Sequence, residues 1–229
     1  MSARTSPNAD ARPAGQAVDT LILHYTGMPS AAAALERLCD PAARVSAHYL
    51  IDEDGAVIAL VPETARAWHA GVSAWQGEPG LNDRSVGIEL VNPGHEWGYR
   101  AFPEPQYRAC IALCQAIIRR WPIPPRRVLG HSDVAPERKE DPGELFDWRR
   151  LAEAGIGLWP ADGPGDPRPV ASLQAGLARF GYAVPTNGRL DDATRLVITA
   201  FQRHFRPERV DGIADAPTLA RLDGLLALL

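Results

Sequence analysis

The segment GHSDVAPERKEDPG, residues 130–143, places an imidazole, an ammonium and a carboxylate close together in a stretch that prolines interrupt. His131 follows directly after VLG, a short apolar run that is typical of a strand. If the chain is extended around Glu140, Lys139 and Asp141 project to one side and Glu140 to the other. A solvated polar loop is the alternative interpretation of so charged a segment.

A second histidine ends another apolar run. VDTLILHYTG, residues 18–27, is almost continuously hydrophobic, which is typical of a strand buried on both faces, and His24 lies near its end. In a sheet with adjacent strands, His24, His131 and Asp141 could converge. Two imidazoles and one carboxylate are a ligand set that Zn²⁺ accepts, with the fourth tetrahedral position left to water, as in catalytic zinc sites.

A carboxylate interrupts a third apolar run, SVGIELVN, residues 85–92. Val86, Ile88 and Leu90 share one face of the expected strand, so Glu89 points to the opposite face. A carboxylate inside an apolar strand is costly unless it is used or paired. Glu89 is therefore either a catalytic base beside the zinc or a buried ion-pair partner.

The remaining patterns predict the elements that would position these side chains. We expect a helix over residues 30–39, a hairpin with its turn at Asp54-Gly55, and a long amphipathic helix over residues 104–121. Buried strands that alternate with helices predict an α/β fold with a mixed central β-sheet flanked by helices. Cys110 and Cys114 are interpreted as small buried apolar residues and not as metal ligands.

Composition divides the chain into four parts. Residues 1–17 are polar and rich in Pro and Ala, which predicts a flexible tail, and residues 18–158 would form the catalytic domain. Residues 159–168, WPADGPGDPR, predict a linker. Residues 169–229 show three helical patterns, which predict a small all-α domain of three helices.

The charge and hydropathy of the chain exclude several classes of partner. Its 229 residues carry a formal net charge of -4 with a pI near 5.9, so the sequence offers no basic surface to nucleic acid. No apolar run has the length of a membrane span, and the N-terminus has no signal-peptide pattern. We expect no nucleic-acid partner, no membrane span and a cytoplasmic location, or a periplasmic one if a leader has been removed; protein partners are unknown.

Several motifs occur in the order in which a known family has them. LILHYTG, SAHYLIDEDG, RAWHAG, LNDRSVGIELVN and GHSDVAPERKEDPG, over about residues 18–155, resemble signature stretches of the N-acetylmuramoyl-L-alanine amidases of the peptidoglycan-recognition-protein-like zinc superfamily. The similarity is greatest to bacterial muropeptide-recycling and broad-specificity amidases. LQAGLARFGY, NGRLDDATRLVITAFQRHF and DGIADAPTL resemble the three-helix peptidoglycan-binding module often attached to cell-wall hydrolases.

This resemblance implies a site and a reaction. Matched by motif, the zinc ligands of the family fall on His24, His131 and Asp141, its catalytic carboxylate on Glu89 and its catalytic lysine on Lys139. The implied reaction is hydrolysis of the amide between the lactoyl group of N-acetylmuramic acid, including its 1,6-anhydro forms, and L-Ala of the stem peptide. The implied substrate is a muropeptide or peptidoglycan, and the implied cofactor is Zn²⁺.

Further residues near the motifs are candidates for substrate contacts, by sugar stacking or by hydrogen bonds to the peptide. They are Trp68, His69, Trp75, Asn82 and Asp83. Some relatives have Tyr where Ala47 stands and Cys as the third ligand, and the chain departs from these. His48 is interpreted as a core residue or as support for a ligand, and His95 and His204 receive no role.

Two other functions stay open on the sequence. A non-catalytic muropeptide-binding protein with the same fold is one, although the chain keeps the full ligand set together with Glu89 and Lys139. A metallopeptidase that cuts within the stem peptide is the other, because similar modules accompany such enzymes. A serine hydrolase is poorly supported, since GHSDV is not G-x-S-x-G. The C-terminal module would either shape the cleft for small anhydro-muropeptides or bind polymeric peptidoglycan.

Overall fold

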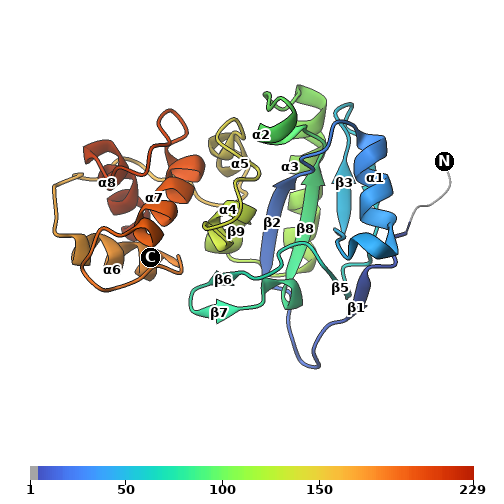
Figure 1. Ribbon diagram of the computed structural model, residues 1–229, viewed down its shortest axis with the longest axis horizontal. Helices are drawn as coiled ribbons and strands as arrows, with labels where there is room; N and C mark the ends of the chain where they lie inside the picture. Colours follow the sequence, from blue (N-terminus) through green and yellow to red (C-terminus); the bar gives the residue numbers. More distant parts are fainter. Residues whose placement is uncertain (1–4) are drawn as a thin grey trace.

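A five-stranded mixed sheet forms the centre of the computed structural model, which describes residues 5–229 (Figure 1). Its strands are, in spatial order, β4 (Val57–Ala59), β3 (Tyr49–Ile51), β8 (Ser85–Leu90), β2 (Thr20–Tyr25) and β9 (Val128–Gly130). Only the hairpin strand β4 is antiparallel to its neighbour, and the other pairs are parallel. The predicted mixed sheet is confirmed.

The long helix α3 (Glu104–Arg120) covers one face of the sheet. Alternate residues of β2 and β8, which are Leu21, Leu23, Val86, Ile88 and Leu90, share a core with Cys110, Cys114 and Ile117 of α3. The short helix α5 (Trp148–Glu153) adds Trp148 and Leu151 to this core. Cys110 and Cys114 are buried free thiols, as expected of apolar positions.

Helix α1 (Ala31–Cys39) packs over the β3 side of the sheet. It begins after Ser30, whose hydroxyl accepts a hydrogen bond from the N–H of Ala33. Its apolar side chains, Ala34 and Leu38, contact Leu50 of β3 in a small separate core. The remaining short elements are α2 (Gly94–Trp97), α4 (His131–Val134), β6 (Ala74–Trp75), β7 (Glu78–Pro79), η1 (Pro41–Ala43), η2 (Leu81–Asp83) and η3 (Pro125–Arg127).

The N-terminal segment is fixed to the sheet region, so the expected flexible tail is wrong for the described residues. β1 (Ala9–Ala11) pairs antiparallel with β5 (Ala65–Ala67). Asn8 is buried, and its side-chain amide donates to two backbone carbonyls. The guanidinium of Arg12 donates to the carbonyls of Asn82, Asp83 and Ser85. Polar side chains that satisfy buried carbonyls hold this segment in place, which its composition does not reveal. Residues 1–4 lie outside the described part.

Three helices form the C-terminal region: α6 (Val170–Phe180), α7 (Asp192–Phe205) and α8 (Ala216–Leu226). The carboxylates of Asp191 and Asp215 cap α7 and α8 by accepting hydrogen bonds from the first turn. Residues 159–168 contain no helix or strand. Among the described residues, no helix is both long and apolar enough to cross a membrane.

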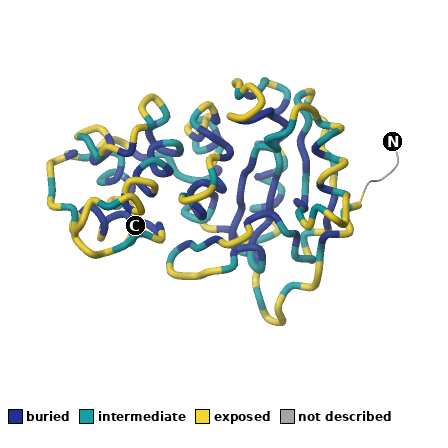
Figure 2. Tube along the Cα trace, in the orientation of Figure 1, coloured by how far each residue is buried: buried dark blue, intermediate teal, exposed yellow. Residues whose placement is uncertain are grey.

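One hydrophobic core continues from the sheet into the C-terminal helices, and Figure 2 shows the buried segments on both sides of this junction. Ile22 of β2 and Leu129 of β9 belong to it, with Phe180, Tyr182, Phe201 and Phe205. The fully buried ring of Trp75 lies between the two regions. It packs edge-on against Phe180 and Tyr182, with ring centroids 5.7 and 4.9 Å apart. The C-terminal helices are therefore packed onto the sheet region, not suspended on a free linker.

Candidate active site

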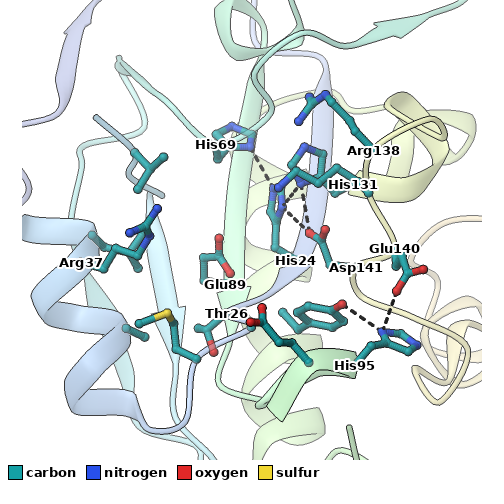
Figure 3. Close-up of a pocket in the computed structure, with 18 of the residues that line it drawn as sticks. His24, Thr26, Arg37, His69, Glu89, His95, His131, Arg138, Glu140 and Asp141 are labelled. Carbon is teal, nitrogen blue, oxygen red and sulfur yellow. Dashed lines mark hydrogen bonds and ion pairs between the residues drawn. The ribbon is translucent and has the colours of Figure 1, made fainter. Parts of the chain in front are cut away.

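A pocket of about 900 Å³ opens at the carboxyl ends of β2, β8 and β9 (Figure 3). One wall comes from α1, another from residues 136–141 and a third from α7 of the C-terminal region. This volume lies within the range of small-molecule sites. The predicted site residues that line it are His24, Trp68, His69, Glu89, His131, Lys139 and Asp141.

Three of these side chains meet at one point. His24 Nδ1 lies 2.9 Å from Asp141 Oδ2 and 3.0 Å from His131 Nδ1, and the third distance, from His131 Nδ1 to Asp141 Oδ2, is 3.1 Å. The parallel pairing of β2 with β9 brings the two histidines together, and the N–H of Ser132 fixes Asp141 by donating to its carbonyl. All three are buried, and their geometry could hold a metal ion.

The charges of this cluster suit a divalent cation. Burial, and then the nearby His131, lowers the pKa of His24 to about 4, so its ring is neutral near pH 7. Burial alone would raise the pKa of Asp141, but its contacts with His131 and His24 hold that pKa well below the usual value. A neutral imidazole beside an ionised carboxylate is the form in which both groups bind a metal.

Glu89 lies next to the cluster on the neighbouring strand. In the parallel pairing of β2 with β8, Glu89 is opposite His24. Both side chains therefore point from the same face of the sheet into the pocket. Burial and the charge of Asp141 raise the pKa of Glu89 well above its usual value, although Lys139 opposes them. Its Oε2 atom is buried and has no hydrogen-bond partner among the described residues. The ion-pair alternative therefore has no partner in this part of the chain.

Lys139 is the only lysine in the sequence, beside 23 arginines among the 24 basic residues. It lines the pocket, and within the described residues its ammonium makes no ion pair or hydrogen bond. The backbone turns directly before this residue, since the N–H of Lys139 donates to the carbonyl of Ala135. Lys139 and Asp141, which were expected to project to one side, both line the pocket.

Trp68 and His69, predicted to contact substrate, differ in exposure. Trp68 is half-buried in the pocket wall, and its indole nitrogen has no partner among the described residues. His69 is buried, with its Nδ1 atom 3.0 Å from His24 Nε2, so it lies behind that ligand candidate (Figure 3). His48 is a core residue, as expected, and its Nδ1 atom accepts the N–H of Gly87.

The other three residues predicted to contact substrate lie outside the pocket. Trp75 is fully buried against the C-terminal helices, so the expected sugar stacking is wrong. The side-chain oxygen of Asn82 accepts the N–H groups of His69 and Ala70, and thereby supports the pocket wall. Asp83 forms an ion pair with Arg66 at 2.5 Å and does not line the pocket either.

Sequence reasoning missed the residues that attach the C-terminal region to the site. His204, to which no role was given, is buried and lies 2.7 Å from Asp133 through its Nδ1 atom. Its ring stacks on Trp148 at 3.8 Å. A signal was present, because His204 follows Phe201 by three residues and Val197 by seven and so belongs to the apolar stripe of α7.

The C-terminal region also contributes directly to the pocket. Leu196, Thr199 and Arg203 of α7 line it, and Arg203 donates to the carboxylate of Glu140 at 3.0 Å. His95 of α2 lines the pocket beside Arg203, where its ring contacts the hydroxyl of Tyr25 and the same Glu140 (Figure 3). The helical module is thus part of the cleft, and its position could not be inferred from helical periodicity.

Comparison with known families agrees with this architecture. The family model of N-acetylmuramoyl-L-alanine amidases matches residues 14–144, and that of a peptidoglycan binding domain matches residues 167–222. Among curated proteins, N-acetylmuramoyl-L-alanine amidase AmiD of Escherichia coli is 41% identical over 231 residues, covering 91% of this chain and 82% of AmiD. 1,6-Anhydro-N-acetylmuramyl-L-alanine amidase AmpD of Citrobacter freundii is 38% identical, covering 64% of this chain and 85% of AmpD.

Solved structures show the same relationship over nearly the whole chain. The complex of E. coli AmiD with anhydro-N-acetylmuramic acid-L-Ala-D-gamma-Glu-L-Lys superimposes with a TM-score of 0.83 at 39% identity, covering 95% of this chain and 92% of AmiD. AMPDH3 of Pseudomonas aeruginosa gives a TM-score of 0.86 at 37% identity, covering 99% and 96% of the two chains. The chain therefore belongs to the N-acetylmuramoyl-L-alanine amidase family and is an enzyme of that class.

Proposed function

We propose that this amidase uses Zn²⁺ held by His24, His131 and Asp141 to cleave the amide between the lactoyl group of N-acetylmuramic acid and L-Ala of the stem peptide. The observation that carries the proposal is the convergence of three ligand atoms within 3.1 Å of one another. The relatives support the substrate class, because AmiD and AMPDH3 have been solved with anhydromuramyl peptides.

The donor set itself supports a cation. His131 Nε2 lies 3.1 Å from the carbonyl of Ala70, which can only accept, so a neutral His131 carries its proton there and turns a bare Nδ1 toward Asp141. A bare nitrogen and a carboxylate oxygen repel each other at 3.1 Å unless a cation or an extra proton lies between them. Zinc bound here would supply a Lewis acid and lower the pKa of a bound water toward about 7.

We assign the proton transfers to Glu89. Glu89 lines the pocket beside the ligand candidates, where its carboxyl group can accept a proton from the attacking water and pass it to the leaving amine. A raised pKa suits this double role, because the carboxyl group must both take and release a proton near neutral pH. The amine then leaves as the new N-terminus of an L-Ala peptide.

Lys139 is assigned to the negative charge that develops on the carbonyl oxygen. Lys139 lines the pocket, and its ammonium forms no ion pair in the described part of the chain. One donor to such an oxyanion is typically worth about 3 kcal/mol of the barrier. Trp68, half-buried in the pocket wall, offers its indole ring as a further contact to the bound substrate.

Soluble 1,6-anhydro-muropeptides are the substrate form we favour. The third wall of the pocket comes from α7, so the C-terminal region serves to shape the cleft around a small ligand. Hydrolysis of purified anhydro-muropeptides and of intact sacculi by the full chain, at equal stem-peptide concentration, measures the preference. Faster release of peptide from sacculi would assign the module to wall binding instead. The cellular compartment stays a prediction from the sequence.

Product analysis tests the reaction. The full-length protein with one equivalent of Zn²⁺ should convert anhydro-muropeptide into free lactoyl-sugar and an L-Ala-terminated peptide, both identified by mass, and a chelator should stop the conversion. Fragments cut within the stem peptide would instead identify a metallopeptidase. Binding without turnover would identify a muropeptide-binding protein. Activity that persists after complete metal removal would refute the zinc assignment.

A further inference from the structure

His69 connects a candidate zinc ligand to the backbone through a continuous line of hydrogen bonds. Its Nδ1 atom lies 3.0 Å from His24 Nε2, and its Nε2 atom lies 3.1 Å from the hydroxyl of Ser85. That hydroxyl is 2.6 Å from the carbonyl of Leu81. Figure 3 shows His69 on the side of His24 that faces away from Asp141.

The carbonyl of Leu81, at the end of this chain of hydrogen bonds, determines the direction of all the others. A carbonyl can only accept, so the Ser85 hydroxyl donates to Leu81 and presents its lone pairs to His69 Nε2. In the described part of the chain no carboxylate contacts the His69 ring, so nothing compensates a second proton. The neutral ring therefore carries its proton on Nε2 and presents a bare Nδ1 to His24.

This arrangement decides the tautomer of His24. Because His69 Nδ1 is bare, His24 donates to it from Nε2–H, and its own Nδ1 is left without a proton. That Nδ1 is the atom that points at His131 and Asp141. We propose, on the basis of the zinc-dependent function above, that His69 and Ser85 are positioning residues that keep the lone pair of His24 directed at the metal.

The backbone of Ala70, the residue after His69, gives His131 the same tautomer. Its Nε2 atom donates directly to the carbonyl of Ala70, so the dipeptide His69-Ala70 controls both imidazole ligands, one by its side chain and one by its backbone. The side-chain oxygen of Asn82 accepts both backbone N–H groups of this dipeptide, at 3.1 and 2.7 Å. Asn82 thus acts on the site without touching substrate.

The strand β8 is built to receive this ring. A Cβ atom on Gly87 would lie 2.5 Å from Cγ and Nδ1 of His69, so only glycine lets the imidazole lie against the strand. Ser85, Gly87 and Glu89 alternate along β8 and share the face toward the site. On this one face of β8, Ser85 accepts the hydrogen bond from His69, Gly87 leaves room for the His69 ring, and Glu89 is the proposed base.

Zinc affinity tests the role of His69. His69→Asn and His69→Leu introduce side chains with the same number of heavy atoms and the same branching at Cγ, but only Asn keeps an acceptor close to the position of Nδ1. We expect His69→Leu and Ser85→Ala to weaken zinc binding by about 10- to 100-fold, measured by competition with a chromophoric chelator at constant pH, and His69→Asn to recover most of the loss. Thermal unfolding of the metal-free variants controls for damage to the fold, because a purely structural role would lower the melting temperature with no loss of zinc affinity.

Nitrogen-15 spectra of the histidine side chains test the tautomers directly. In the zinc-loaded protein we expect protons on Nε2 of His24, His69 and His131, and a bare Nδ1 on His69. A proton on His69 Nδ1 would overturn the proposal, and so would parent-like zinc affinity in both His69→Leu and Ser85→Ala. Either result leaves the amidase assignment untouched, whereas a parent protein that binds no zinc would overturn the proposed function first.

Discussion

Asp133 and Asp141 are both buried carboxylates of the segment that follows β9, yet their surroundings are opposite in kind. Hydrogen-bond donors surround Asp133: the N–H of Gly130 and Nδ1 of His204 each lie 2.7 Å from Oδ2, and the hydroxyl of Tyr182 donates to Oδ1 at 2.6 Å. Asp141 instead meets two imidazole nitrogens that also lie 3.0 Å from each other.

The contrast separates a structural carboxylate from one that we propose as a zinc ligand. Three donors offset the desolvation of Asp133, so this residue is complete without a ligand and joins the sheet region to Tyr182 and His204 of the C-terminal region. The contacts of Asp141 are not complete in this sense, because each of the two imidazole nitrogens beside its Oδ2 atom lies about as close to the other nitrogen as to the carboxylate. Burial alone would not have told the two aspartates apart, whereas the identity of their partners does.

Exchanging each carboxylate for an amide should produce the largest difference. Asp141→Asn removes the charge from the ligand cluster, and we expect no retained zinc after dialysis and no detectable hydrolysis of anhydro-muropeptide. Asp133→Asn should keep zinc and activity but lower the free energy of unfolding by about 1 to 3 kcal/mol, because one amide N–H then faces a donor. Metal analysis, product chromatography and denaturant titration with chelator measure the three quantities.

A backbone hydrogen bond links the surroundings of Asp133 and Asp141, so a substitution at one could affect the other. The N–H of Ser132, next to Asp133, donates to the carbonyl of Asp141 at 2.9 Å. If Asp133→Asn released zinc as readily as Asp141→Asn, the two carboxylates would belong to one functional unit and the distinction drawn from their partners would fail.

Glu89 is a third carboxylate and has neither donors nor imidazoles as partners for Oε2. Glu89→Gln should lower kcat by about 100- to 10,000-fold while zinc affinity stays close to that of the parent, because a proton acceptor is lost but no ligand is. The variant should also unfold at a higher denaturant concentration, since a buried unpaired carboxylate is costly. Glu36→Gln, on the exposed side of α1, is the matched control and should change neither quantity. Equal kcat for Glu89→Gln and the parent would remove Glu89 from the reaction.

Lys139 differs from Asp133, Asp141 and Glu89 because it is a cation that lines the pocket without an ion pair in the described part of the chain. Lys139→Ala should keep zinc and lower kcat by about 100- to 1,000-fold, the usual effect of losing one oxyanion donor. Arg149→Ala, an exposed cation on α5 outside the pocket, is the control. As Lys139 is the only lysine, carbamylation by cyanate can modify no other side-chain ammonium, and it should inactivate the parent but not further inactivate Lys139→Ala. Parent-like turnover of the carbamylated enzyme would contradict the role.

Local patterns predicted much of the sheet and the approach of His24 to His131, and the family resemblance then singled out Asp141 as their partner. Apolar runs identify β2 and β8, and residues at the carboxyl ends of adjacent parallel strands have to lie close together. The strand face that carries Glu89 followed from alternation alone. These inferences succeeded because the positions of the side chains depend on the period of a strand and on the neighbouring strand.

The donors of Asp133 could not be predicted, because they come from a helical region far along the chain. The same distance along the chain explains why Trp75 was wrongly expected to contact substrate. Its loop has the composition of a substrate-binding segment, but its ring packs against the C-terminal helices. Asn8 and Arg12 were assigned to a flexible tail because the backbone carbonyls that they satisfy leave no trace in the sequence. Contacts of side chains with distant backbone atoms are the common feature of these cases.

Tyr182→Phe should give the smallest and most specific effect, since it removes one donor from Asp133 and nothing from the proposed zinc ligands. Burial, and then the charge and hydrogen bond of Asp133, raise the pKa of Tyr182 well above its usual value near 10. The tyrosine therefore stabilises the fold fully below pH 10, and this contribution falls by about 1.4 kcal/mol per pH unit as the pH rises from 10 toward the pKa in the folded protein.

Denaturant titrations of the parent and of Tyr182→Phe, both in chelator, test this dependence. At pH 8 the variant should be less stable by about 1.5 to 3 kcal/mol, the usual contribution of a hydrogen bond to a charged group. Above pH 10 the two stability curves should converge, because only the parent has to keep a proton on a phenol that the unfolded chain has already released. A deficit that stays constant from pH 8 to pH 11 would mean that Tyr182 contributes packing alone, and that Asp133 is held by Gly130 and His204 without it.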